Sequence, residues 1–352
     1  MDVIYVSTQD ELLEACVQWG EPVIAIDIEC ENNLHYYGSF ISIIQISTST
    51  KNWIIDVLLL DDITPVLDML RDKTRVKIFH DVEFDFRILG YEFQVRPSNV
   101  FDTKYVAQLL GKEHLGLGAL LEEYFGVHKE KQFQMADWTK RPLSKGMISY
   151  AAKDTKYLIE LYKQLISELE AKGRLAWAQE EFDNNEIRDF PYKVPEFNDA
   201  KGIYILNSEQ KGIFKELFIL REQLAKKLNK PVHYIMSNKT LLLLAQNPPK
   251  NDSAWNSLKG VHKIVKSRSI VFSQAVIKGR KNPVVMEKPP RLKMNSEQKK
   301  LLDSYSQARD KAADSLGLER HMIISKDQLV QLVTGDDPRL FSWQKYMLEK
   351  FS

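Results

Sequence analysis

Short runs of apolar residues alternate with polar turns in the first third of the chain. The run Val23-Ile24-Ala25-Ile26 is typical of a buried strand. We expect successive strands at residues 23–29, 40–48 and 52–57. Helices and strands then alternate over residues 63–71, 76–79, 81–90 and 100–102. This order predicts an α/β domain with a mixed sheet, closed by a long helix that carries Tyr150 and Asp154.

The rest of the chain changes to helical spacing. Apolar residues recur every three or four positions and indicate one buried helical stripe: Ile213, Leu217, Leu220, Leu224 and Leu228. An acidic, proline-containing linker near residues 183–200 is expected to join this helical part to the α/β domain.

The helical part contains an internal repeat with a shift of 88 residues. Asn207-Ser208-Glu209-Gln210-Lys211 recurs as Asn295-Ser296-Glu297-Gln298-Lys299. The same shift aligns four further pairs without a gap: His233 with His321, Ser237 with Ser325, Leu241 with Leu329 and Trp255 with Trp343. Each copy is predicted to open with a helix capped by Ser208 or Ser296. Because the second copy ends soon after Trp343, its last helix is expected to be shortened or rearranged.

Acidic residues stand where the predicted elements aim them at a common point. Asp27 and Glu29 are two apart at the end of a strand, so their side chains share one face. Asp85 lies at the opening of a predicted helix, and Tyr150 and Asp154 are four apart on one helix face. Each feature alone has an ordinary explanation, such as a surface strand, a helix-dipole acid or a solvated helix pair. Their combination favours a functional site.

A carboxylate cluster of this kind predicts bound metal. Like charges near 4 Å repel by roughly 4 kcal/mol at an effective dielectric of 20, so the cluster needs cations or raised pKa values. Oxygen ligands suit two divalent ions, Mg²⁺ or Mn²⁺, which can together promote phosphodiester hydrolysis. Zinc is disfavoured, because two cysteines and seven histidines show no ligand spacing.

With these motifs in place, residues 21–171 resemble the DEDD exonuclease domain of the ribonuclease D family, in its tyrosine-bearing subclass. The catalytic motifs are Val23-Ile24-Ala25-Ile26-Asp27-Ile28-Glu29, the stretch from Lys77 to Asp85, and Tyr150-Ala151-Ala152-Lys153-Asp154. Supporting stretches are Ile43-Ile44-Gln45-Ile46-Ser47, Phe101-Asp102-Thr103, Ala136-Asp137-Trp138 and Arg141-Pro142-Leu143-Ser144. The resemblance implies a ribonuclease H-like fold.

The resemblance also implies roles for the site residues. Asp27, Glu29 and Asp154 would hold one metal ion, and Asp27 would bridge to a second ion supported by Asp85. The Tyr150 hydroxyl would orient the attacking water, and a 5′-mononucleotide would leave from the 3′ end.

The sequence also suggests roles for residues close to these motifs. Asp81 and Glu83 are rival acids within the second motif, but the family spacing from His80 selects Asp85. Asp81 is expected to cap the following helix. Gln45 and Lys131 are further expected contacts to the terminal nucleotides.

The repeated unit resembles the HRDC helical domain, which follows the nuclease domain twice in some bacterial ribonuclease D proteins. We expect an exonuclease domain at residues 1–190 and all-α HRDC-like domains at 203–282 and 294–352. Between the copies, residues 260–293 hold nine Lys and Arg against the single acid Glu287. This stretch suits either contact with an RNA backbone or solubilising surface, and its end, from Gly279 to Lys293, is predicted to be a linker.

Charge is divided unevenly along the chain. The net charge is +1, but residues 201–352 hold 28 Lys and Arg against 14 Asp and Glu, whereas residues 1–200 hold 21 against 34. An acidic half joined to a basic half suits metal chemistry beside phosphate binding. Solvated lysine-rich helix faces would give the same asymmetry.

The chain also lacks features of membrane and secreted proteins. No stretch approaches the roughly 18–20 apolar residues that span a bilayer, and the N-terminus lacks a signal-peptide core. Cys16 and Cys30 are the only cysteines, which favours the reducing cytoplasm. The oligomeric state is not predicted.

The sequence is compatible with three functions. The first is a metal-dependent 3′-5′ exoribonuclease acting on single-stranded 3′ ends of structured RNA, such as tRNA precursors. The second is an exonuclease acting on DNA, and the third is a non-catalytic RNA-binding protein on the same scaffold. The third would predict a missing ligand, whereas all five catalytic positions are filled.

Overall fold

The computed structural model describes residues 2–287 and 293–352, which form two compact units. The first unit combines the residues up to Glu29, Ile41–Tyr192 and the residues from 293 onward. The second unit combines Cys30–Phe40 with the described residues from Lys193 to 287. The expected linker therefore lies partly outside the described residues, at 288–292.

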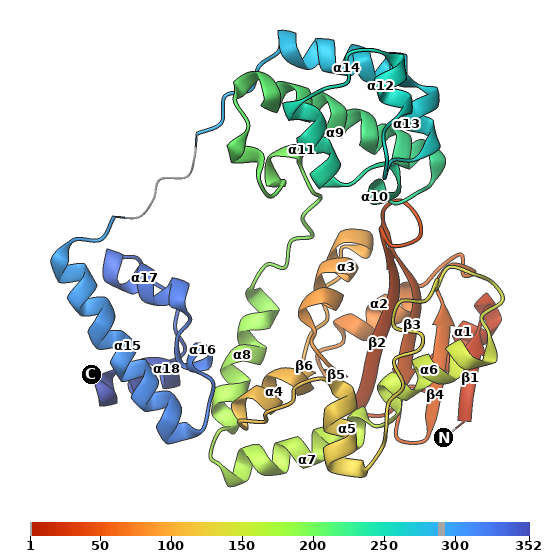
Figure 1. Ribbon diagram of the computed structural model, residues 1–352. Helices are drawn as coiled ribbons and strands as arrows, with labels where there is room; N and C mark the ends of the chain where they lie inside the picture. Colours follow the sequence, from red (N-terminus) through yellow and green to blue (C-terminus); the bar gives the residue numbers. More distant parts are fainter. Residues whose placement is uncertain (1, 288–292) are drawn as a thin grey trace. The chain divides into compact units, whose positions relative to one another are not determined.

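A single sheet runs through the exonuclease-like part (Figure 1). Its strands are β1 (Asp2–Val6), β2 (Val23–Asn32), β3 (Ser39–Ser47), β4 (Lys51–Asp56), β5 (Val76–Phe79) and β6 (Val100–Asp102). Their order is β1-β4-β3-β2-β5-β6. β1 runs parallel to β4, β5 runs parallel to β2 and β6, and β3 and β4 are antiparallel. The predicted mixed sheet is confirmed, and β1 adds an edge strand to the predicted set.

The sheet is buried because apolar residues fill its central strands. Ile24, Ala25 and Ile26 of β2 have no exposed surface, as expected for a strand covered on both faces. Some polar side chains that enter this interior hydrogen-bond across it, which offsets the cost of burying them. Asn52 of β4, for example, donates to Ser47 Oγ of β3 at 2.5 Å.

Eight helices of the first unit precede the helical repeats. They are α1 (Gln9–Val17), α2 (Thr64–Arg71), α3 (Glu83–Phe93), α4 (Thr103–Leu109), α5 (Leu117–Phe125), α6 (Lys145–Lys156), α7 (Leu158–Ala171) and α8 (Leu175–Ile187). The expected long closing helix is two helices that meet at Tyr157. α8 continues to Ile187, so the expected linker from residue 183 begins as helix.

The second unit is helical. After two short 3₁₀ turns, Phe197–Asp199 and Ile203–Ile205, it contains α9 (Ser208–Leu228), α10 (Val232–Ile235), α11 (Asn238–Gln246), α12 (Asp252–Asn256), α13 (Lys263–Ser267) and α14 (Ser269–Lys281). Phe214, Leu217, Trp255 and Phe272 are buried in its core. α14 extends through Gly279 to Lys281, so the predicted linker starts later than expected.

The internal repeat is evident in the helix boundaries. α15 (Ser296–Leu316), α16 (Arg320–Ile323) and α17 (Lys326–Thr334) lie 88 residues after α9, α10 and α11, with the same lengths. The predicted serine caps are wrong by one position, because Asn207 and Asn295 are the N-caps. Each asparagine side chain accepts the N–H of the glutamine three residues later, and that glutamine accepts the asparagine N–H.

The second copy ends differently and packs within the first unit. Its last helix, α18 (Ser342–Phe351), contains Trp343 at the position equivalent to Trp255. Trp343 stacks on Trp177 of α8 with ring centroids 4.6 Å apart. Arg174 donates to Leu316 O at 2.6 Å. The second repeat therefore shares a hydrophobic core with the exonuclease-like part.

Within the described residues, each helix is too short or too polar to span a lipid bilayer.

Candidate metal centre

Three acids from two distant segments meet at one point in the first unit. Asp27 and Glu29 project from β2, and Asp154 projects from α6. Each acid contributes one carboxylate oxygen, and these three oxygens all lie within 4.8 Å of one another. Asp154 is buried, whereas Asp27 and Glu29 are partly exposed. The convergence expected from strand and helix periodicity is therefore present for these three residues.

Asp85 lies beside this cluster but outside its closest group. It is in the first turn of α3 and is 6% exposed. Burial is the main cause of the raised pKa of both Glu29 and Asp85; the charge of Asp85 adds to the first shift, and the charge of Asp27 adds to the second. Asp85 is thus close enough to add a fourth charge to the cluster.

The acids resist ionisation without a cation. Burial, and then the charge of Asp154, raises the pKa of Asp27 from an ordinary 3.8 to about 7. Burial also raises the pKa values of Glu29 and Asp85 well above normal, and the charge of Asp27 adds to both. Such clustering of unfavourable charge is typical of functional sites.

Lys129 is the cation within this cluster. It forms an ion pair with Asp154, and its ammonium lies 5.1 Å from the centroid of the Tyr150 ring. Its positive charge lowers the pKa values of Asp27, Glu29 and Asp154, and so partly offsets the rise caused by burial. Sequence reasoning did not identify Lys129; it named Lys131 of the same loop, which is exposed, as a contact to the terminal nucleotides. Both lysines stand in one loop without periodicity, so nothing in the sequence distinguishes them.

Gln45 supports the cluster from the sheet. It is fully buried on β3, and its Nε2 donates to Asp27 Oδ2 at 3.2 Å. This bond orients the Asp27 carboxylate. The expected contacts of Gln45 and Lys131 with nucleotides stay predictions.

Polar side chains of the sheet fix the position of α6. Asn52 donates to Ala152 O at 3.0 Å and to Thr155 Oγ1 at 2.8 Å, and Ser47 donates to the same Thr155 oxygen at 2.7 Å. These bonds are buried, so they hold the helix against the sheet in one register. Asp154 lies between their attachment points and is positioned by them.

The loop before α6 is anchored in the same way. Arg141 donates to Asp56 Oδ1 at 2.8 Å and to Ser42 Oγ at 3.0 Å. Ser144 caps α6 by accepting the N–H of Met147 at 3.2 Å. The supporting motif around residues 136–144 thus positions the helix that carries Tyr150 and Asp154.

The expected cap of α3 is wrong. Asp81 has a left-handed backbone, with φ of 68°, and its side chain pairs with Lys104 at 2.5 Å. Asp102 instead accepts the N–H groups of Asp81 at 2.9 Å and Val82 at 3.2 Å. It also caps α4 by accepting the N–H of Lys104. The Phe101-Asp102-Thr103 motif therefore holds the turn that presents Asp85.

A hollow of about 280 Å³ is lined by Lys129, the ion-pair partner of Asp154. Tyr150 and Phe133 line it with their rings edge to face, 5.8 Å between centroids, and Lys129 and Lys153 also line it. Aromatic rings beside cationic groups suit a base and its phosphate.

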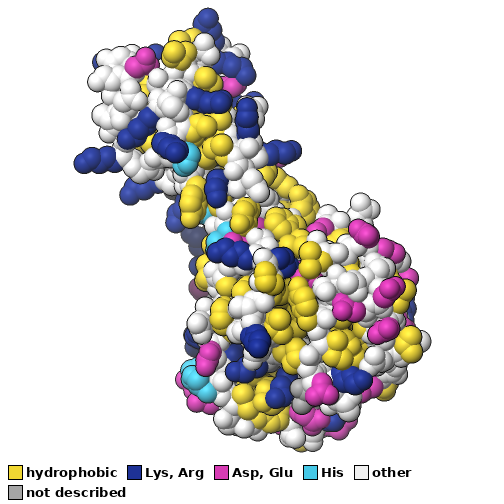
Figure 2. Space-filling view, turned by 90° about the vertical axis from the view of Figure 1, so that its right-hand side faces the viewer, with side chains coloured by type: hydrophobic (Ala, Val, Ile, Leu, Met, Phe, Trp, Pro, Cys, Tyr) yellow, Lys and Arg dark blue, Asp and Glu magenta, His cyan; other side chains and the backbone are white. Residues whose placement is uncertain are grey.

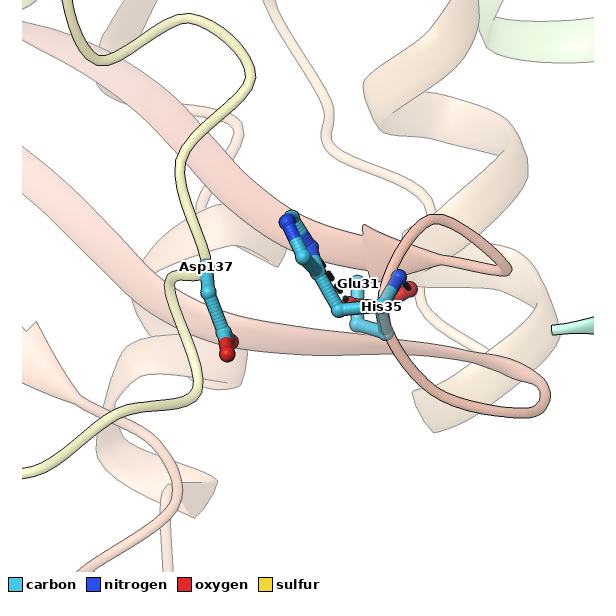
Figure 3. Close-up of side chains that lie close together, drawn as sticks. All are labelled: Glu31, His35 and Asp137. Atoms are coloured by element: carbon cyan, nitrogen blue, oxygen red, sulfur yellow. Dashed lines mark hydrogen bonds and ion pairs between the residues drawn. The ribbon is translucent and has the colours of Figure 1, made fainter. Parts of the chain in front are cut away.

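Glu31, the next carboxylate along β2, is engaged locally. It accepts the N–H groups of Leu34 at 2.5 Å and His35 at 2.9 Å. Its other oxygen lies 3.4 Å from His35 Nδ1 (Figure 3). These contacts fix the loop after β2 within the second unit.

The donor set fits divalent metal. All four candidate ligands are carboxylates, and three of them place oxygens close together. The positive charge of Lys129 partly offsets their negative charge. Hard cations such as Mg²⁺ and Mn²⁺ prefer oxygen ligands of this kind.

Replacing Lys129 by Gln is expected to destabilise the metal-free protein more at pH 8 than at pH 5. The folded pKa of Asp27 is raised, so its contribution to stability is complete below about pH 4 and is lost as pH rises through about 7. Removal of Lys129 deepens that loss, by about 3 kcal/mol at pH 8. Urea denaturation in EDTA measures the difference, with Lys131→Gln as the charge-matched exposed control. Equal losses at both pH values would refute the role given to Lys129.

Comparison with known proteins gives a consistent family. Residues 3–170 match the 3′-5′ exonuclease domain family, and residues 210–275 match the HRDC domain family. Over 349 residues the chain is 26% identical to ribonuclease D of Pseudomonas paraeruginosa, covering 96% of this chain and 91% of that protein. It is 34% identical over 260 residues to exosome complex component 10 of Mus musculus, covering 70% of this chain. The chain spans only 29% of that relative's length.

Solved structures agree on the fold. Escherichia coli RNase D superimposes with a TM-score of 0.77 at 23% identity, covering 99% of this chain and 97% of that one. The catalytic core of RRP6 from Trypanosoma brucei gives a TM-score of 0.69 at 25% identity, covering 79% of both chains.

Proposed function

Because this chain belongs to the ribonuclease D family, with a 3′-5′ exonuclease domain followed by an HRDC domain, we propose that it is a metal-dependent 3′-5′ exoribonuclease. It would release 5′-mononucleotides from the 3′ end of RNA. The observation that carries the proposal is the meeting of Asp27, Glu29 and Asp154 beside an aromatic hollow.

We assign the metal ligands from this arrangement. Asp27, Glu29 and Asp154 would hold one ion, and Asp27 would share a second ion with Asp85, directly or through water. Two Mg²⁺ or Mn²⁺ ions bound there would supply a nucleophile at neutral pH and stabilise the leaving oxygen. The raised pKa values of the free acids support this assignment, because bound cations would allow all four carboxylates to ionise.

Tyr150 would orient the attacking water. Burial and the neighbouring charges of Asp154, Glu29 and Asp27 raise the pKa of its phenol above the ordinary 10. The phenol therefore stays protonated at neutral pH and acts as a hydrogen-bond partner rather than a base. Phe133 would stack on the terminal base.

RNA is the favoured substrate. The relatives include ribonuclease D and exosome components, and the E. coli structure is described as an exoribonuclease involved in structured RNA processing. We propose single-stranded 3′ ends of structured RNA, including tRNA precursors. We also propose the domain boundaries 1–190, 203–282 and 294–352.

Incubation of 5′-labelled RNA with Mn²⁺ or Mg²⁺ is expected to give a ladder of products shortened from the 3′ end. Matched DNA is expected to be trimmed more slowly. Gel electrophoresis of both reactions and chromatography of the released nucleotides provide the measurement. Equal or faster trimming of DNA would favour the DNA exonuclease, and no trimming of either would favour the non-catalytic protein.

A further inference from the structure

Helix α6 carries three lysines outside the face that bears Tyr150 and Asp154. Lys145 and Lys156 are exposed and Lys153 is half-buried. With 3.6 residues per turn, Lys145 and Lys156 lie on the side of α6 opposite Asp154, and Lys153 lies between that side and Tyr150. We call Lys145, Lys153 and Lys156 the groove lysines.

These lysines line a groove that continues from the hollow beside Tyr150 and Phe133. A second hollow, of about 260 Å³, is lined by all three groove lysines together with Ser149 and Ile148 of α6 and Val3 of β1. Ser149 and Lys153 line both this hollow and the one beside Tyr150. The two hollows therefore meet along α6 and extend the site away from the acids.

The charges in the groove are not neutralised by the protein. Other lysines of the first unit, such as Lys104 and Lys163, pair with carboxylates of Asp81 and Glu160. Across the residues that the structure describes, no ion pair involves a groove lysine. This gathering of free cations stands out because residues 1–200 carry an excess of acids.

The face that bears α6 is turned to the viewer in Figure 2. There, Lys and Arg side chains lie among hydrophobic side chains on the first unit. A strip that combines cationic and apolar groups suits a single strand, whose phosphates are anionic and whose bases are apolar.

We propose that the groove along α6 holds the RNA strand upstream of the scissile phosphate, with the groove lysines contacting backbone phosphates. Lys145 and Lys153 are eight residues apart, or about 12 Å along the helix, so they would contact different phosphates of the strand. The inference rests on the proposed function, since it assigns the path by which the same substrate reaches the acids. The contacts are to the backbone and are therefore independent of sequence.

Binding measurements in EDTA test the groove without hydrolysis. The triple variant Lys145→Gln, Lys153→Gln and Lys156→Gln is compared with a control that changes three exposed lysines elsewhere in the first unit, Lys73, Lys163 and Lys345, to Gln. For a ten-nucleotide oligoadenylate, the plot of log affinity against log salt should become less steep by about 2 in the groove variant, because each single-strand phosphate contact contributes about 0.7. The control should keep the wild-type slope. Equal slopes in wild type and groove variant would overturn the proposal.

Hydrolysis measurements separate this inference from the proposed function. The groove variant should lower the ratio of kcat/KM for the decamer to kcat/KM for a dinucleotide by about tenfold, because only the longer strand reaches Lys145 and Lys156, whereas Lys153 also lines the hollow beside Tyr150. An unchanged ratio would contradict the groove. Wild-type protein that hydrolyses neither substrate would defeat the proposed function, while the salt slopes would still decide the groove. Since Lys153 adjoins Asp154, the double variant Lys145→Gln and Lys156→Gln repeats both measurements without altering that position.

Discussion

Replacing Asp27 by Asn is expected to reduce RNA hydrolysis at least ~10³-fold, the largest effect of any single change in the site. Asp27 is the residue shared by both proposed metal positions, and Gln45 orients its carboxylate at 3.2 Å. An amide of the same size loses the negative charge that both ions need. Single-turnover hydrolysis of labelled RNA at saturating Mn²⁺ measures the loss.

The same variant separates catalysis from folding. In EDTA at pH 8, Asp27→Asn should melt at a higher temperature than the wild type, because it removes one like charge from beside Asp154 and Glu29. Glu181→Gln is the matched control, since burial also raises the pKa of Glu181 to about 7, but Glu181 lies in α8 outside the acid cluster. The control should retain activity. Normal hydrolysis by Asp27→Asn would exclude the assigned ligands.

Replacing Gly279 by Ala is expected to destabilise the second unit by about 3 kcal/mol or more. A Cβ at Gly279 of α14 would lie 2.4 Å from Ile213 Cα and 2.6 Å from Gly212 O of α9. These are backbone atoms, so the helices must move apart. Their separation would loosen the core around Phe272 and Trp255.

Thermal unfolding followed by Trp255 fluorescence, with the other tryptophans replaced by Phe, reports on the second unit. Gly90→Ala provides the control, because Gly90 is helical in α3 and an added Cβ there meets nothing within 4 Å. It should be neutral or stabilising by up to about 1 kcal/mol. A Gly279→Ala protein that melts like the wild type would show that α9 and α14 are not in close contact.

The sequence predicts the acids well because their positions depend on local periodicity. Residues two apart on β2 and four apart on α6 must share a face, so the sequence could predict that Asp27, Glu29 and Asp154 lie close together. The internal repeat could also be recognised from the sequence, because aligning the chain with itself at a shift of 88 residues requires no knowledge of tertiary contacts. Both features follow from regular secondary structure and sequence spacing alone.

Features that depend on irregular structure could not be predicted. Lys129 reaches Asp154 from a loop whose path is set by tertiary contacts, so no local pattern indicates this ion pair. Asp81 has a suitable type for a cap, but Asp102, from another strand end, supplies that bond. The packing of Trp343 on Trp177 likewise joins residues too distant for any local pattern to connect.

We expect the converging acids to bind two divalent ions. Titration of metal-free protein with Mn²⁺, followed by electron paramagnetic resonance at pH 8, tests it directly, with a 5′-mononucleotide present. The wild type should bind two ions per chain. Binding should be weaker at pH 6, because Asp27 is then protonated more often. Asp27→Asn should lose both high-affinity ions. Binding of Mn²⁺ that is absent in the wild type, or unchanged in the variant, would contradict this expectation.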